Sequence, residues 1–136
     1  MEITKKFNLP KDFAKRWVTA LRSGKYEQSN DNGCLHFRNR YCCLGVGGAV
    51  CGMSVDVMGN NSVLPKIDII PTEIQDYEKL AYILMCLNDG LSLEKYEEFK
   101  EQVGVTFRKF LLEDVETTSL TFSEIADFIE DNCNFI

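Results

Sequence analysis

The sequence lacks the features that would place the protein in a membrane or in a secretory pathway. No apolar run approaches the roughly 20 residues that a transmembrane helix needs, and the opening MEITKKFNLPKDF has no apolar block of the kind found in a secretory signal. The chain has 136 residues, with a hydrophobic fraction of 45% and a charged fraction of 26%, as in an ordinary globular protein. We therefore expect a single cytoplasmic domain over residues 1–136.

Residues suited to metal binding or thiol catalysis are also scarce. The sequence has one histidine, His36, and six cysteines, none of which forms a Cys-x-x-Cys pair. Because adjacent Cys42 and Cys43 point in different directions and cannot form a zinc knuckle, we expect no metal and no other cofactor. In a reducing cytoplasm the cysteines would be buried free thiols, which pack as small hydrophobic side chains.

Positive charge is missing from the C-terminal part of the chain. From Leu111 to Ile136 there are seven acidic residues and no Lys or Arg, and the net charge is +5 over residues 1–44 and −11 over residues 45–136. Such a segment repels a nucleic-acid backbone. The stretch TFSEIADFIE resembles the first helix of a helix-turn-helix, but the residues after it are acidic and too few to form a recognition helix. We expect no duplex-DNA partner; the acidic surface would solvate the protein or dock a basic partner.

The centre of the sequence is an uncharged, glycine-rich stretch, Tyr41 to Gly52, which reads YCCLGVGGAVCG. A stretch of this kind is expected to be buried, although its periodicity does not separate a helix from a pair of strands. We favour a short helix, because the spacing of Gly45, Gly48 and Gly52 would align them along one groove that another element can approach closely.

Further patterns predict an α+β fold, a single domain in which several helices pack on a small antiparallel sheet. An amphipathic helix is expected from Pro10 to Gly24, and a half-buried strand or hairpin from Cys34 to Tyr41, with Leu35 and Phe37 inward. The other expected elements are a strand, turn and strand over Met53–Leu64, a helix from Thr72 to Leu87, helices beginning at Ser92 and Thr106, and a helix over Thr121–Asp131 that opens with a capping box.

Five motifs occur in a recognisable order: WVTALRSGKYEQ (17–28), YCCLGV (41–46), VLP (63–65), LND (87–89) and TFSEIADFIE (121–130). Together they resemble a family of small uncharacterised proteins of tailed bacteriophages and prophages. The sequence departs from that family in two places. GGAVCG follows YCCLGV where the family has Leu-Cys-Asp, and residues 90–120 are an insertion between LND and TFSEIADFIE. The resemblance implies a phage accessory protein in the cytoplasm of an infected bacterial host, and it brings no activity, catalytic residue or ligand.

The candidate binding residues are the basic and aromatic side chains of the N-terminal part, together with two polar residues of the LND motif. Guanidinium groups bind phosphate oxygens bidentately and aromatic rings stack on bases, so this composition suits a nucleotide or a short single strand. Alternatively, the rings fill the core and the cations pair with the acidic half of the chain. The candidates are Trp17, Arg22, Lys25, Tyr26, His36, Arg38, Arg40, Tyr41, Asn88 and Asp89.

These observations support two functional hypotheses. In the first, the protein is a non-enzymatic inhibitor of host anti-phage defence, which sequesters a small anionic, nucleotide-type signal or occludes a host protein. Self-association into a homo-oligomer would enclose a small ligand more completely than one domain can. In the second, it is a small enzyme of unrecognised type that uses Cys42 or Cys43 with His36, or Asn88 and Asp89, in a cleft.

Overall fold

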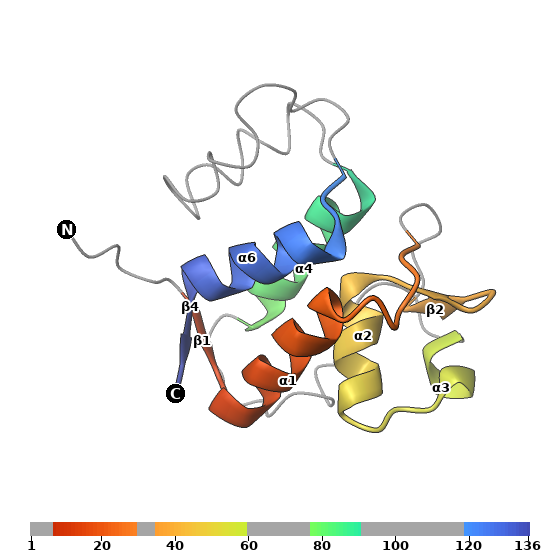
Figure 1. Cartoon of the computed structure of the whole chain (residues 1–136), viewed down its shortest axis with the longest axis horizontal. Coiled ribbons are helices and arrows are strands. Elements are labelled where there is room, and N and C mark those ends of the chain that lie inside the picture. Colours follow the sequence, from red (N-terminus) through yellow and green to blue (C-terminus); the bar gives the residue numbers. More distant parts are fainter. Residues whose placement is uncertain (1–6, 30–34, 60–76, 91–118) are drawn as a thin grey trace.

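The computed structural model describes residues 7–29, 35–59, 77–90 and 119–136, and within them it confirms the α+β class. The helices are α1 (Lys11–Arg22), α2 (Cys43–Val50), α3 (Val55–Gly59), α4 (Tyr77–Asp89) and α6 (Phe122–Asn132). The strands are β1 (Phe7–Leu9), β2 (His36–Phe37), β3 (Arg40–Tyr41) and β4 (Cys133–Phe135). Helix α1 packs against both α6 and α2, and α4 contacts the same two helices (Figure 1).

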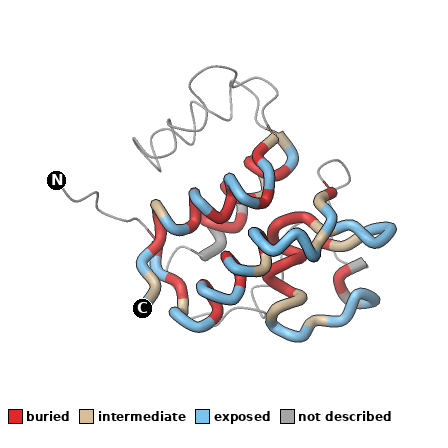
Figure 2. The backbone as a smooth tube through the Cα atoms, viewed as in Figure 1, coloured by how far each residue is buried: buried red, intermediate tan, exposed pale blue. Residues whose placement is uncertain are grey.

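Helix α1 forms as its amphipathic pattern predicts. Its inward stripe, which includes Phe13, Trp17 and Leu21, is buried, and the cations of its outer face are exposed. Figure 2 shows the same division for α6, where buried and exposed positions alternate along the tube at helical spacing. The capping box predicted at the start of α6 is present, because the Thr121 side chain accepts from Glu124 N and the Glu124 carboxylate accepts from Thr121 N.

The glycine-rich centre is a helix, α2, as favoured from the sequence. Two of its glycines allow close approach by other parts of the chain. A Cβ at Gly45 would lie 1.8 Å from the Leu35 carbonyl oxygen, and a Cβ at Gly47 would lie 3.2 Å from the Trp17 indole nitrogen. The predicted groove of Gly45, Gly48 and Gly52 is therefore only partly right, since Gly52 is exposed, has a φ of +86° and lies in the turn after the helix.

The predicted hairpin is present and Leu35 is buried as expected, but the inward direction expected for Phe37 is wrong. Strands β2 and β3 pair antiparallel around Arg38 and Asn39, whose φ values are 51° and 65°. The two-residue turn places Tyr41 opposite His36, on the same face as that residue. Phe37, expected inside, is 42% exposed because it lies at the tip of the hairpin, beyond the core that covers Leu35.

A second strand pair, β1 with β4, was not predicted from the sequence. These strands run parallel, with Phe7 opposite Cys133 and Leu9 opposite Phe135. Two hydrogen bonds continue the pairing beyond the strands: Ile136 N donates to Leu9 O and Lys11 N donates to Ile136 O, both at 2.9 Å. The described sheet structure is thus two separate two-stranded pairs, and the β2–β3 hairpin alone has the antiparallel form expected.

The strand predicted at the start of Met53–Leu64 is wrong, because helix α3 occupies this part of the chain. Met58 N donates to Ser54 O at 3.1 Å, and this single turn buries the Met58 side chain to 1% exposure. Helix α4 confirms the end of the predicted Thr72–Leu87 helix, with Ala81 and Leu84 buried. The predicted second strand up to Leu64, the Thr72 cap and the helices expected from Ser92 and Thr106 lie outside the described residues.

The contact between Gly45 and Leu35 gives the first prediction. We expect Gly45→Ala to lower the free energy of unfolding by more than about 3 kcal/mol, because backbone atoms that cannot rotate away occupy the space of the new methyl group. Urea denaturation followed by circular dichroism measures the loss. Gly24→Ala is the control: Gly24 has a φ of +77° and nothing within 4 Å of a Cβ, so it should lose only about 1 kcal/mol from backbone strain. Equal losses in the two variants would contradict the packing role of Gly45.

Candidate functional site

Trp17, a candidate ligand-stacking ring, is instead part of the core. Its side chain is 0% exposed, and its ring centroid lies 5.0 Å from that of Phe13. The indole N–H donates to the carbonyl oxygen of Cys43 at 2.9 Å, so its polar atom is also used inside the protein. The expectation that Trp17 binds a ligand is therefore corrected; its large ring fits against α2 because Gly47 has no side chain.

Asn88, another candidate, is a buried structural residue that joins several segments. Its Oδ1 accepts from Cys43 N at 3.1 Å and from Gln28 Nε2 at 2.9 Å, and its Nδ2 donates to Ser29 O at 2.8 Å. We call these four residues the Asn88 cluster. Nδ2 also donates to Asp89 Oδ1 at 3.0 Å, so both ends of the amide are hydrogen-bonded and Asp89 supports the cluster from the exposed side.

Two of the candidate arginines are paired with carboxylates. Arg22 bridges α1 to α6 through Asp127, at 2.5 Å, and Glu130. The hydrogen bond to Glu130, followed by that to Asp127, raises the pKa of Arg22 above its ordinary value. Arg40 lies 3.5 Å from Glu27 in an exposed pair, which holds it weakly. These contacts match the alternative in which cations of the front pair with acidic residues.

Three other candidates form a cluster of rings at the base of the hairpin. The Tyr41 ring lies 4.9 Å from that of Tyr26 and 4.7 Å from that of His36, both in edge-to-face contacts, and all three side chains are half-buried. Backbone hydrogen bonds fix this arrangement, since Tyr41 N donates to Glu27 O at 2.8 Å and Ser29 N donates to Tyr41 O at 2.7 Å. The rings of Tyr26, Tyr41 and His36 are thus held on one surface.

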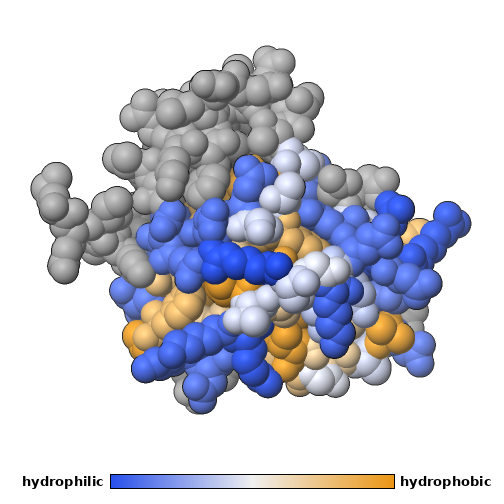
Figure 3. Space-filling view, viewed as in Figure 1, coloured by the Kyte–Doolittle hydropathy of each residue, from blue (hydrophilic) through white to orange (hydrophobic). Residues whose placement is uncertain are grey.

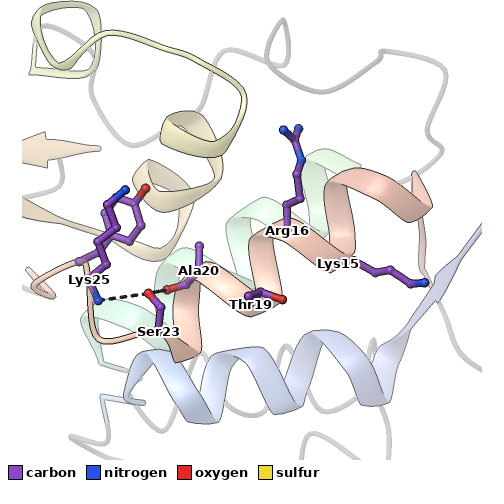
Figure 4. Close-up of a pocket in the computed structure, with 7 residues that line it drawn as sticks. Lys15, Arg16, Thr19, Ala20, Ser23 and Lys25 are labelled. Atoms are coloured by element: carbon purple, nitrogen blue, oxygen red, sulfur yellow. Dashed lines mark hydrogen bonds between the residues drawn. The ribbon is translucent and has the colours of Figure 1, made fainter.

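Beside this cluster an open groove of about 360 Å³ runs along the outer face of α1. That volume is near the lower end of the range typical of small-molecule sites, about 300–1,000 Å³. In Figure 4, Lys15 and Arg16 project from the middle of α1, and Lys25 lies past its C-terminal end beside Ser23. We call this the basic groove; its lining residues are Lys15, Arg16, Thr19, Ala20, Ser23, Lys25 and Tyr26.

The cations of the basic groove are not neutralised by acidic residues. No carboxylate of the described part of the chain forms an ion pair with Lys15, Arg16 or Lys25, and all three are exposed. Lys25 Nζ lies 5.5 Å from the centroid of the Tyr26 ring. The face seen in Figure 3 is hydrophilic over α6, over the first turns of α1 and over the hairpin.

The sequence identified Lys25 and Tyr26 as candidate binding residues but not the five other residues that line the groove. Lys15, Thr19 and Ser23 are spaced by four residues, and Arg16 follows Lys15, so helical periodicity on the outer face of α1 could have found them. The same periodicity identifies the buried stripe of α1. From the sequence alone, the outer stripe of this helix resembles the solvated face of any amphipathic helix.

The thiols of the YCC motif lie in an environment that keeps them protonated. Both are buried, and burial raises the pKa of Cys42 to about 11 even though the Gly45 N–H points at its sulfur, 3.4 Å away. Burial also raises the pKa of Cys43, whose Sγ donates to Leu84 O at 3.5 Å. A catalytic cysteine needs the opposite shift, and the described His36 packs against Tyr41. The thiol-enzyme hypothesis gains no support from this geometry.

Clusters of metal-binding side chains and membrane-spanning helices are both absent from the described residues. Among residues 7–29, 35–59, 77–90 and 119–136, no three His, Cys, Asp or Glu side chains gather closely enough to hold a metal ion. Within the same segments, no helix combines the length and the apolar character required to cross a bilayer.

The described residues define an α+β protein with an open basic groove on its first helix. A family model matches residues 10–133, and the chain therefore belongs to that family, which carries the description Domain of unknown function (DUF8296). Comparisons with curated proteins and with solved structures find no match.

The Asn88 cluster gives the second prediction. We expect Asn88→Ala to lower the free energy of unfolding by about 2–4 kcal/mol, because the buried Cys43 N–H and Ser29 carbonyl lose their partner. Chemical denaturation measures this loss. Asp89→Asn is the matched control, since its amide oxygen still accepts from Asn88 and it should change stability by less than about 0.5 kcal/mol. A folded Asn88→Ala variant of normal stability would show that Asn88 is available for a ligand.

The buried thiols give the third prediction. The pKa of Cys42 rises from 9.0 to about 11 on folding, so between these pH values the unfolded thiol loses its proton while the folded one keeps it. The free energy of unfolding should therefore fall with rising pH, by up to about 1.4 kcal/mol per pH unit for this thiol. Denaturation at pH 8 to 11 measures the slope. Cys42→Ser, whose hydroxyl can still accept from Gly45 N, should have a smaller slope; an unchanged slope would contradict the assignment.

Proposed function

We propose that the protein is a non-enzymatic binding protein that sequesters a small anionic ligand of nucleotide type in the basic groove. The observation that carries the proposal is the presence of three exposed cations, Lys15, Arg16 and Lys25, without an acidic partner in the described structure, around a hollow that also offers a hydroxyl and a ring. The protein has a net charge of −6, so its acidic residues outnumber its basic residues. A hollow lined by unpaired cations therefore differs in charge from the molecule as a whole.

The lining chemistry supports an anionic ligand with an aromatic part. Lys and Arg bind phosphate oxygens through charge-assisted hydrogen bonds, and the Thr19 hydroxyl can donate to the same oxygens. The Ser23 hydroxyl is already engaged, because it donates to Ala20 O at 2.7 Å and accepts from Lys25 N at 3.1 Å, and it thereby holds the backbone at Lys25 beside the groove. Tyr26 offers a half-buried ring against which a base can stack.

The proposal requires binding alone. The buried, protonated thiols of Cys42 and Cys43 give no activated nucleophile, whereas sequestration needs only affinity. In a cell infected by a phage, such a protein would lower the free concentration of a nucleotide signal that activates host defence. The resemblance of the five motifs to phage and prophage proteins supports this biological setting. Occlusion of a host protein remains the competing role.

The fourth prediction tests the proposal in the basic groove. AMP, ATP, ADP-ribose and cyclic mono- and dinucleotides are added to the purified protein, and at least one should raise its melting temperature, because a ligand that binds the folded state stabilises it. Replacing Lys15, Arg16 and Lys25 together by Gln should weaken that ligand by at least about 10-fold in isothermal titration, since charge-assisted hydrogen bonds are lost.

Lys11→Gln is the matched control, because Lys11 is an exposed cation of α1 outside the groove lining. It should bind the ligand as the unaltered protein does. The ligand should also be recovered chemically unchanged from the denatured complex. The proposal is wrong if no nucleotide shifts the melting temperature, if the triple variant binds as tightly as the control, or if a product appears. A stable complex with a host protein that persists in the triple variant would favour the competing role.

A further inference from the structure

We propose that the ligand of the basic groove is a single-stranded oligonucleotide, whose phosphates lie along the outer face of α1 and whose bases stack on the half-buried rings of Tyr26, Tyr41 and His36. This inference rests on the proposed function and names the class of its ligand. It is carried by the continuity between the groove and the hairpin, which are joined through the contact of Tyr26 with Tyr41.

The basic groove is elongated. Its lining begins at Lys15 and Arg16 and continues to Ser23, which directly follows α1 and lies eight residues after Lys15, a span of about 12 Å at the rise of an α-helix. Lys25 then supplies positive charge at the far end. Cations at both ends, with the small polar and apolar residues Thr19 and Ala20 between them, suit a ligand with more than one phosphate along its length.

Aromatic side chains continue from the end of the groove. Tyr26 lines the groove and contacts Tyr41, and Tyr41 contacts His36. We call Tyr26, Tyr41 and His36 the ring track. Proteins that bind single strands combine a basic groove with rings of this kind, because every base has a face that can stack.

The remaining candidate cation, Arg38, lies at the tip of the hairpin with Phe37. Its guanidinium lies over the Phe37 ring, 5.0 Å from the centroid, and no described carboxylate pairs with it. Because neighbouring residues of a strand point to opposite faces, Phe37 lies on the face of the hairpin away from His36 and Tyr41 and does not belong to the ring track.

Hydrogen bonds hold the groove and the track in fixed positions. The backbone bonds between Tyr41 and Glu27 and between Ser29 and Tyr41 attach the segment after Lys25 to β3. Nearby acidic groups are partly neutralised, because Arg22 engages Asp127 and Glu130. A preformed surface needs less ordering on binding, and the engaged carboxylates repel phosphates less.

The fifth prediction tests this inference with fluorescein-labelled oligothymidylates of 2, 4, 8 and 12 nucleotides in an anisotropy titration at fixed salt. We expect the dissociation constant to fall with length until the groove and track are filled, and then to level. A DNA duplex should bind more weakly than the single strand of equal length, because its bases are not free to stack. Polyglutamate of equal charge should also bind more weakly, since it has no bases.

His36→Ala isolates the ring track. It should weaken the 8-nucleotide strand by roughly 5- to 100-fold, the value of stacking one base, and leave the affinity for thymidine monophosphate unchanged, because His36 does not line the groove. Phe37→Ala is the matched control, because it removes the neighbouring ring of β2 on the opposite face of the hairpin. It should bind the strand as the unaltered protein does.

Failure of this inference and failure of the proposed function give different results. If mononucleotides bind but affinity does not grow with length, or His36→Ala binds the strand normally, the oligonucleotide assignment is wrong and the proposed function stands. If polyglutamate or the duplex binds as tightly as the single strand, the assignment is also wrong. If neither mononucleotides nor oligonucleotides bind, both proposals fail.

Discussion

The arrangement of the protein depends on the hydrogen bonds of one buried amide, that of Asn88. This side chain at the end of α4 accepts from the first backbone N–H of α2 and donates to the carbonyl of Ser29. Asn88 is also linked to the segment that leads into α6, because the amide of its partner Gln28 donates to Leu120 O at 2.8 Å. Because an unsatisfied polar group is costly in a core, these segments have little freedom to move apart, and the surface built on residues 25–29 inherits that rigidity.

Three of the sequence motifs, WVTALRSGKYEQ, YCCLGV and LND, meet in space at the start of α2. Trp17 of the first motif donates to Cys43 of the second, Cys43 in turn donates through its N–H to Asn88 of the LND motif, and Gln28 completes the contact from the end of the first motif. The packing and hydrogen bonding of a core therefore explain these residues of the three motifs. The basic groove and the ring track lie outside that core, where residues can change without loss of the fold.

Local patterns in the sequence identify those elements whose signals are local. The amphipathic stripe of α1 and the Thr121–Glu124 capping box depend on residues a few positions apart, and both are found as expected. The parallel pairing of β1 with β4 depends on partners at opposite ends of the described chain, and strands of three residues carry no readable alternation. The inward direction expected for Phe37 was wrong because the two-residue turn at Arg38 and Asn39 places this residue at the tip of the hairpin, beyond the core. Candidate ligand residues were harder to predict, because residue type does not reveal which atoms are already engaged: Trp17 and Asn88 have partners at distant positions in the chain.

The pairing of β1 with β4 has a consequence for how the protein is made. Asn8 and Asn134 are hydrogen-bonded although 126 positions separate them, so β1 has no partner in its pair until the chain has been synthesised as far as β4. Contacts of such long range form late, because the loop that they close is costly in entropy. On the ribosome, helix α1 can be made early, but the edge that precedes it stays open to solvent until β4 emerges from the exit tunnel.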